Sequence, residues 1–367
     1  MSECFDQSLF KEYQFIRQVG KGAYGVVFEA NRRISGERVA IKKCFGCFQN
    51  TTDAQRIYRE VSALMSMSHP NILRLRDVLI PSTHSLDIYV ITEFVPIDLA
   101  AVIKHGLLQD VHRLYITYQI LKGLDYMHRI TLLHRDIKPS NILLDSHCNV
   151  RLCDFGLVRL QDSDSFNSNK TDYVATRWYR APEIILGSKA YSFPVDLWAT
   201  GTTLAEMFSG KQLFPGTSTL NQLERIIELT GFPSDEELVA LGGMSSFGIL
   251  QNVSNTLHVH SLAEFVPHAS HVVLDLLRQM LQFSPSERIS ASMAMRHGAF
   301  AKFHTIDPTP IPEHPYKPKV ADSVRLSPMD YRSLLDNEVS EWKVHAKVMG
   351  DFERRPDVIA PMSIIGS

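Results

Sequence analysis

Residues 134–141 of the chain read HRDIKPSN, which places three polar side chains at a fixed spacing. We expect Asp136 to orient a hydroxyl group and accept its proton, Lys138 to offset charge on a moving phosphoryl group, and Asn141 to bind a metal ion. Thirteen residues beyond Asn141 the sequence DFG begins with Asp154, whose carboxylate can chelate Mg²⁺ that bridges the phosphates of a nucleotide. These two segments predict a site for phosphoryl transfer to a hydroxyl.

A glycine-rich segment precedes them. Gly20, Gly22, Gly25 and Val27 fit the pattern G-x-G-x-x-G-x-V between two expected strands. Glycine lets the backbone approach a triphosphate closely, so that amide N–H groups can face the phosphate oxygens. A dinucleotide-binding fold uses similar spacing, but there a helix follows the last glycine, whereas a strand follows it here. The pattern therefore favours a nucleotide triphosphate over a dinucleotide.

Lys42 ends the sequence VAIK on the next expected strand, from which it could reach the α- and β-phosphates. An isolated lysine on a strand is more often a solvated edge charge. Glu60 in the following helix is the candidate partner, because a lysine–glutamate ion pair would hold the lysine on the phosphates.

The hydrophobic pattern divides the chain into two regions. A period-two alternation predicts strands up to residue 94, a helical period appears in one segment there, and helical periods dominate afterwards. The expected strands cover 13–19, 26–31, 38–43, 72–79 and 86–94, and the expected helix covers 51–67 with Thr52 or Asp53 as its N-cap. Later helices are expected near 111–124 and over 195–208, 219–230, 272–281 and 290–297. We predict an α+β fold of two lobes, an antiparallel sheet with one helix at residues 13–95 and a larger helical lobe at 96–303, with a ligand cleft between them.

The two ends of the chain lie outside this pattern. Residues 1–12 are interpreted as an N-terminal tail and residues 304–367 as an extension that packs back on the body. Ser327 and Pro328 predict the start of a last helix, with serine as N-cap and proline at the first helical position. A detached linker is the alternative, but it would have little need for an apolar stripe consisting of Tyr331, Leu334, Leu335, Val339 and Trp342.

Composition restricts the partners and the compartment. The 367 residues include 38 Lys and Arg against 40 Asp and Glu, so we expect neither a nucleic-acid nor a membrane partner. Five cysteines and an N-terminus without a signal peptide indicate reduced thiols in the cytoplasm or the nucleus. We expect a monomer.

Over roughly residues 13–303 these motifs together resemble a eukaryotic protein kinase. A lysine two residues after the aspartate of the HRD segment is typical of serine/threonine kinases, whereas tyrosine kinases have other residues there. The resemblance also implies three structural residues: Glu183 of the sequence APE, Arg288 as its partner, and Asp196 as a brace for the 134–141 loop.

Between DFG and APE the sequence Thr171-Asp172-Tyr173 resembles the dual-phosphorylation lip of mitogen-activated protein kinases. Arginine is the natural partner of phosphate, and several arginines stand near the motifs. The resemblance assigns phospho-Thr171 and phospho-Tyr173 to two groups: Arg56, Arg59, Arg135 and Arg159 for the first, Arg177 and Arg180 for the second. The alternative is that Thr171 and Tyr173 are ordinary loop residues.

Longer stretches resemble the atypical extracellular signal-regulated kinases seven and eight. They are NTTDAQRIYREV, GLLQDVH, SNILLDSHCNVRLCDFGL and PGTSTLNQLERIIE. That branch tends to phosphorylate its own lip, and it carries glutamate where this chain has Asp172.

The same resemblance predicts an ATP site at the connection between the lobes. Thr92 is expected at the back of the nucleotide pocket, the backbones of Glu93 and Val95 at the adenine edge, and Asp98 at the ribose. The full set of expected ATP contacts is Val19, Gly20, Lys21, Gly22, Ala23, Tyr24, Gly25, Val27, Ala40, Lys42, Thr92, Glu93, Val95 and Asp98.

We therefore predict a serine/threonine kinase of the mitogen-activated type that uses ATP and Mg²⁺ and prefers a proline after the target hydroxyl. Its expected partners are protein substrates, an upstream dual-specificity kinase and phosphatases. A cyclin-dependent-kinase-like enzyme and a catalytically silent scaffold are the alternatives. The T-x-Y lip and the extension argue against the first, and the intact motifs argue against the second.

Overall fold

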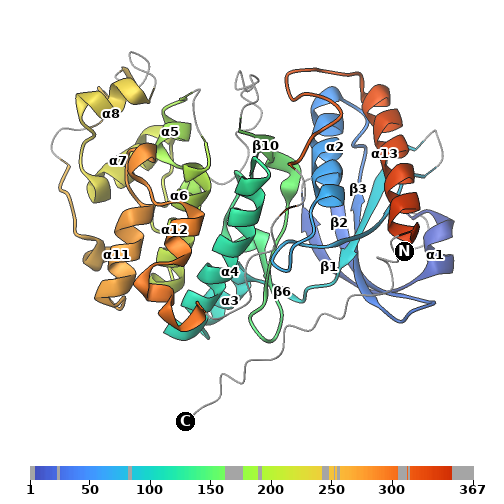
Figure 1. Ribbon diagram of the computed structural model, residues 1–367, viewed down its shortest axis with the longest axis horizontal. Coiled ribbons are helices and arrows are strands. Elements are labelled where there is room, and N and C mark those ends of the chain that lie inside the picture. Colours follow the sequence, from blue (N-terminus) through green and yellow to red (C-terminus); the bar gives the residue numbers. More distant parts are fainter. Residues whose placement is uncertain are drawn as a thin grey trace, which may run out of the picture.

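The computed structural model describes residues 5–348 with nine gaps, at 23–24, 82–84, 162–176, 189–191, 242–247, 252, 254–256, 305–311 and 313–314. It contains two lobes, the first built on a sheet and the second mainly helical, as the sequence predicted (Figure 1). Within the described part of the chain, no helix combines the length and apolar character needed to cross a membrane.

The N-terminal lobe contains a five-stranded antiparallel sheet with the order β1-β2-β3-β5-β4. The strands are β1 Tyr13–Gly22, β2 Gly25–Arg32, β3 Arg38–Cys44, β4 Leu75–Leu79 and β5 Ile88–Glu93. Strand β4 begins later than expected, because Ile72 leaves this sheet and bridges Leu152 of the other lobe. The turn before β3 contains Gly36 with φ 72°, a conformation that glycine adopts without strain.

Alternation along β5 explains how this sheet is buried on both faces. Ile88 and Val90 belong to the large cluster that includes helix α2, whereas Tyr89 and Ile91 belong to a second cluster beside Leu9 of helix α1 (Gln7–Glu12). Successive side chains of a strand point to opposite faces, so this run of apolar residues serves two cores.

Helix α2 (Thr51–Ser66) lies against the inner face of the sheet. Its N-cap is Asn50, whose side-chain oxygen accepts a hydrogen bond from the backbone N–H of Asp53 at 2.9 Å. The expectation of Thr52 or Asp53 as N-cap was wrong, because Asn50 reaches the third helical N–H and starts the helix at Thr51.

The C-terminal lobe is organised around helices α4 (Asp110–Arg129) and α6 (Pro194–Ser209), with α4 near the middle of the molecule in Figure 1. Both helices are buried over most of their length, and Trp198 of α6 stacks on Phe214 with ring centroids 5.7 Å apart. The other α-helices among the described residues of the lobe are α3 Leu99–His105, α5 Pro182–Ile185, α7 Thr219–Thr230, α8 Asp235–Ala240, α10 Leu262–Phe265, α11 His271–Met280 and α12 Ala291–Met295. The 3₁₀ turns in the described part of the chain are η2 Pro139–Asn141, η3 Phe155–Leu157, η5 Arg177–Tyr179, η6 Pro285–Glu287 and η7 Gly298–Phe303.

Two small sheets lie where the lobes meet and carry the loops of interest. One has the order β6-β8-β9 and the other pairs β7 with β10. Their strands are β6 Ile97–Asp98, β7 Leu132–Leu133, β8 Ile142–Leu144, β9 Val150–Leu152 and β10 Arg159–Leu160. The HRDIKPSN loop joins β7 to β8, and the DFG segment follows β9, so the short strands bring these two segments together.

The last helix, α13 (Pro328–Val348), lies beside α2 on the N-terminal lobe (Figure 1). Ser327 accepts a hydrogen bond from the N–H of Asp330 at 3.2 Å, which is the cap predicted from Ser327-Pro328. Tyr331, Leu335 and Val339 are buried in the large core cluster, and Leu334 and Trp342 pack against it.

Candidate functional site

A buried aspartate fixes the backbone of the HRDIKPSN loop. Asp196, in the first turn of α6, accepts hydrogen bonds from the N–H groups of His134 and Arg135 at 3.0 and 2.8 Å. His128 of α4 lies 3.0 Å from the same carboxylate. Burial alone would raise the pKa of Asp196, but these hydrogen bonds hold it below its ordinary value. The carboxylate therefore stays charged and supports Arg135, whose φ of 68° is unusual for a side chain with a Cβ.

The three polar side chains predicted from this loop converge on one carboxylate. Asp136 accepts hydrogen bonds from the ammonium group of Lys138 at 2.7 Å and from the amide of Asn141 at 2.8 Å. The Asn141 amide also donates to the backbone carbonyl of Asp136 at 2.9 Å. Two donors thus fix the orientation of the Asp136 carboxylate, and the side-chain oxygen of Asn141 remains as its acceptor for a cation.

The DFG segment lies directly beside this loop. The N–H of Cys153 donates to the backbone carbonyl of Asn141 at 3.0 Å, and Phe155 is buried 5.2 Å from the His134 ring. Asp154 has φ 63° and ψ 73°, the left-handed region that aspartate tolerates better than most residues. Burial would raise its pKa, but the positive charges of Lys42 and its neighbours lower it below the ordinary value.

Lys42 and Glu60 form the ion pair that the sequence suggested. Lys42 lies on β3 opposite Val90 of β5, and its ammonium group donates to Glu60 of α2 at 2.5 Å. Burial would lower the pKa of Lys42, but the Glu60 carboxylate raises it above its ordinary value, so the lysine is charged. The ion pair links α2 to strand β3 of the sheet.

The glycine-rich segment forms the β1–β2 hairpin, in which Gly20 pairs with Val27 and Gly22 with Gly25. A Cβ at Gly25 would lie 2.0 Å from the backbone oxygen of Lys43, so no other residue fits there without moving β3. A Cβ at Gly22 would meet nothing within 4 Å. Val19 and Lys21 lie on the same strand, while the expected contacts Ala23 and Tyr24 lie outside the described residues.

The connection between the lobes holds the other residues predicted to bind ATP. Buried Thr92 on β5 pairs with Ala40 on β3. The Glu93 carboxylate accepts from the N–H of Arg74 at 2.8 Å and from Arg151 of β9 at 3.0 Å, which links the two lobes. Val95, further along this connection, is half-buried.

Asp98 has a structural task at the start of α3. Its carboxylate accepts a hydrogen bond from the N–H of Ala101 at 2.8 Å and caps the helix. The second carboxylate oxygen is the one that remains for the expected ribose contact.

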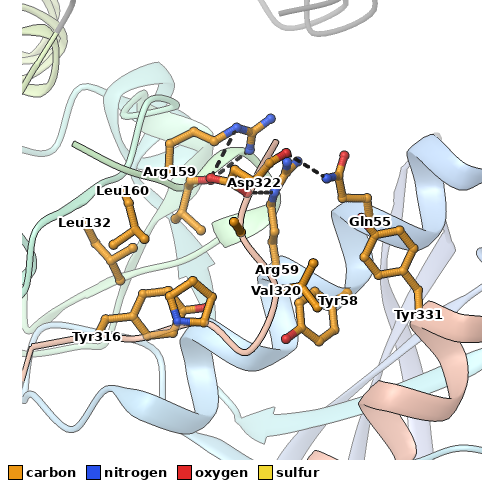
Figure 2. Close-up of a pocket in the computed structure, with 13 residues that line it drawn as sticks. Gln55, Tyr58, Arg59, Leu132, Arg159, Leu160, Tyr316, Val320, Asp322 and Tyr331 are labelled. Carbon is orange, nitrogen blue, oxygen red and sulfur yellow. Dashed lines mark hydrogen bonds and ion pairs between the residues drawn. The ribbon is translucent and has the colours of Figure 1, made fainter. Parts of the chain in front are cut away.

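The arginines predicted to receive lip phosphates occupy several places. Arg59 of α2 and Arg159 of β10 converge on Asp322 of the C-terminal extension (Figure 2). Arg56 lies 3.7 Å from Asp154. Arg135 donates to the carbonyl of Leu157, Arg177 donates to the carbonyl of Thr217, and the N–H of Arg180 donates to the carbonyl of Arg177.

Thr171 and Tyr173 lie outside the described residues, so their assignment to these arginines stays a prediction. Sequence reasoning did not find Asp322. It lies far from every motif in the chain, and no spacing rule connects it to Arg59.

Glu183 and Arg288 form the ion pair implied by the resemblance, with distances of 2.5 and 2.6 Å between their oxygens and nitrogens. They join α5, at the end of the APE segment, to the loop between η6 and α12. A charge-bearing pair this deeply buried is stable only with both partners present.

The fold and this site define a protein kinase. The family model described as protein kinase domain matches residues 13–300. The chain is 41% identical over 365 residues to Extracellular signal-regulated kinase 2 of Dictyostelium discoideum, with 98% of each chain covered. It is 44% identical to Mitogen-activated protein kinase 15 of Rattus norvegicus over 92% of this chain and 62% of that one. It is 38% identical to Extracellular signal-regulated kinase 7 of Drosophila melanogaster, over 91% of this chain and 38% of that one.

The chain therefore belongs to the mitogen-activated protein kinases, a family of serine/threonine protein kinases. The resemblance to the atypical branch of extracellular signal-regulated kinases is confirmed by these relatives. The chain spans nearly the whole of the Dictyostelium relative and less than two thirds of the other two.

Proposed function

We propose that this kinase transfers the γ-phosphate of ATP to serine or threonine hydroxyls that are followed by proline, and that phosphorylation of Thr171 and Tyr173 switches it on. The observation that carries the proposal is the convergence of Lys138 and Asn141 on the Asp136 carboxylate. Such a carboxylate is held in one orientation, as a group that must align a hydroxyl and accept its proton requires.

The residues of the site divide the work of transfer. Asp136 orients the substrate hydroxyl and takes its proton, and Lys138 beside it offsets charge on the moving phosphoryl group. Lys42, held by Glu60, binds the α- and β-phosphates. Catalysis then rests on positioning and on electrostatic stabilisation, with no covalent intermediate on the protein.

Mg²⁺ fits the two residues proposed to hold it. Asp154 offers a charged carboxylate and Asn141 a side-chain oxygen whose amide group already points to Asp136. The described residues contain no group of three or more His, Cys, Asp or Glu that could hold a metal ion by themselves. Mg²⁺ at nucleotides takes one or two protein ligands together with phosphates and water, so such a group is not required. When bound, the ion neutralises phosphate charge.

The remaining partners follow from the family and the composition. We propose protein substrates with Ser-Pro or Thr-Pro sites, an upstream dual-specificity kinase and phosphatases as partners, and a monomer that works in the cytoplasm, the nucleus or both. Self-phosphorylation of the lip is the proposed route in the absence of an upstream kinase. The balanced charge, 38 basic against 40 acidic residues, supports the absence of nucleic-acid partners.

Mass spectrometry of the lip tests the proposal in bacteria, where the wild type is compared with Asp136→Asn. Phosphate on Thr171 and Tyr173 in the wild type alone is the expected result, while Asp136→Asn still binds ATP. Undiminished transfer by Asp136→Asn would overturn the role of this residue. An unmodified wild-type lip with activity on a Ser-Pro peptide would instead leave an upstream kinase as the route to lip phosphorylation.

A further inference from the structure

Asp322 of the C-terminal extension lies between two arginines, Arg59 of α2 and Arg159 of β10. Asp322 accepts a hydrogen bond from the Arg59 guanidinium at 2.6 Å through one carboxylate oxygen. Its other oxygen lies 4.0 Å from Nε of Arg159. The three side chains are only 11–13% exposed and line a pocket between α2, β7, β10 and the extension (Figure 2).

The two arginines lie on elements that adjoin the residues proposed to bind ATP and to act on the substrate hydroxyl. Arg59 is the residue next to Glu60, the partner of Lys42. Arg159 belongs to β10, which follows the DFG segment and pairs with Leu133 at the start of the HRDIKPSN loop. Asp322 therefore connects α2, which carries the partner of Lys42, with β10, the strand beside the HRDIKPSN loop.

The extension also holds α2 at other points along its length. The hydroxyl of Tyr58 donates to Glu338 of α13 at 2.7 Å, and the hydroxyl of Tyr316 donates to Ser62 at 3.2 Å. The Gln55 amide donates to the backbone carbonyl of Asp322 at 3.3 Å. These contacts span two turns of α2, so the helix has a support that does not depend on the lip.

We propose that Asp322 is a positioning residue for ATP, which acts by holding α2 so that Glu60 reaches Lys42 before the lip carries phosphate. This inference rests on the proposed function, because the same arginines are those assigned to phospho-Thr171. The carboxylate supplies the negative charge that the phosphate would bring. The chain thus has basal activity with an unmodified lip, and that activity is what first phosphorylates the lip.

The charge of Asp322 is the property that matters. Ion pairs on the surface contribute little because water and salt screen them, but partly buried pairs are screened much less. Replacing the Asp322 carboxylate with an amide keeps the size of the side chain. It removes the negative charge that faces the two poorly hydrated guanidinium groups of Arg59 and Arg159. The ion pair between Lys319 and Glu341 offers the contrast, because it belongs to the same extension and is largely exposed.

The test uses the full chain with the lip substitutions Thr171→Ala and Tyr173→Phe, so that no lip phosphate is present. Asp322→Asn in this background is expected to lower kcat/KM for ATP about tenfold, with a higher KM for ATP and an unchanged KM for a Ser-Pro peptide. Glu341→Gln is the matched control and is expected to leave both values unchanged. Asp322→Glu is expected to restore most of the loss, whereas a merely structural role would not produce this split between the two substrates.

A second variant separates the ion pair from a general loss of stability. Arg59→Gln alone should lower kcat/KM for ATP about as much as Asp322→Asn does. The double variant should lower it no further than either single variant, because both substitutions remove the same interaction. Melting temperatures of all variants are measured in parallel.

Activity of Asp322→Asn equal to that of the lip-substituted parent chain would overturn the proposal. Higher activity would overturn it too, because it would show that the carboxylate restrains the enzyme. A lip-substituted chain that is silent while the native-lip chain is active would overturn it as well. If the native-lip chain also transfers no phosphate, the proposed function fails instead.

Discussion

Arg288 and Glu183 form two parallel hydrogen bonds of 2.5 and 2.6 Å, and their side chains are 0% and 1% exposed. Arg288 also donates to the backbone carbonyls of Gln282 and Phe283 and stacks 5.0 Å from the Trp198 ring. The guanidinium is therefore satisfied on every side by the core of the C-terminal lobe. Glu183 ends the segment that follows the lip, so this pair anchors the end of that segment to a rigid surface.

Glu183→Ala is predicted to lower the free energy of unfolding by about 3–5 kcal/mol, because it leaves the buried Arg288 guanidinium without a counter-charge. Urea unfolding of the purified variant measures the loss. The double substitution Glu183→Ala with Arg288→Met should recover part of it, since no unpaired charge is then buried. A single variant within about 1 kcal/mol of the wild type would show that the pair contributes little.

Glu60→Gln is predicted to lower kcat/KM for ATP at least tenfold, which corresponds to about 1.4 kcal/mol of transition-state stabilisation. The 2.5 Å ion pair with Lys42 loses its charge, and the lysine is then free to leave the phosphates. Steady-state kinetics with varied ATP measures the effect. Glu236→Gln, at an exposed position on α8, is the control and should match the wild type. Unchanged kinetics of Glu60→Gln would remove this pair from the mechanism.

The architecture was predictable because its signals are local. Period-two and helical patterns depend on neighbours in the chain, so β2, β3, α2 and α7 fall within a few residues of the predicted ranges. The misplaced features depend on atoms that a pattern does not describe. Asn50 caps α2 through one side-chain hydrogen bond, and Ile72 leaves β4 because it meets Leu152 of the other lobe.

Within the site, motif residues were predictable and their supports were not. The short spacing of Asp136, Lys138 and Asn141 brings them together on one turn, so the sequence alone indicates a common site. Asp322 lies 263 positions from Arg59, and the packing of the C-terminal extension on α2 brings the two together. An acidic residue in a proline-rich extension carries no pattern that identifies such a partner.

His69 is predicted to contribute to the pH dependence of the free energy of unfolding. Burial, with the positive charges of Lys122 and Arg151, lowers the pKa of His69 from 6.5 to about 3. The imidazole therefore stays neutral in the fold while the unfolded chain binds a proton below pH 6.5. Stability must fall as the pH falls from 6.5 toward 3, because the unfolded state then binds more protons.

Between pH 7 and pH 5 the His69 contribution lowers the free energy of unfolding by about 2 kcal/mol, at about 1.4 kcal/mol for each pH unit below 6.5. Urea unfolding of the wild type and His69→Gln at both pH values measures it, and the variant should lose about 2 kcal/mol less than the wild type. His304→Gln, at an exposed position, is the control and should follow the wild type. Identical pH slopes for all three chains would contradict a neutral, buried His69.

Leu335→Ala tests whether the extension is part of the folded kinase. Leu335 is 0% exposed on α13 and belongs to the same core cluster as Ile57 and Val61 of α2, so the substitution leaves a cavity beneath α2. The expected loss is about 2–5 kcal/mol, measured by urea unfolding. Met329→Ala, on the same helix but 49% exposed, should change stability by less than about 0.5 kcal/mol. If the two variants unfold at the same urea concentration, α13 contributes nothing to the core. If Leu335→Ala alone is destabilised and also raises KM for ATP, the extension supports α2 and through it the pair of Lys42 and Glu60.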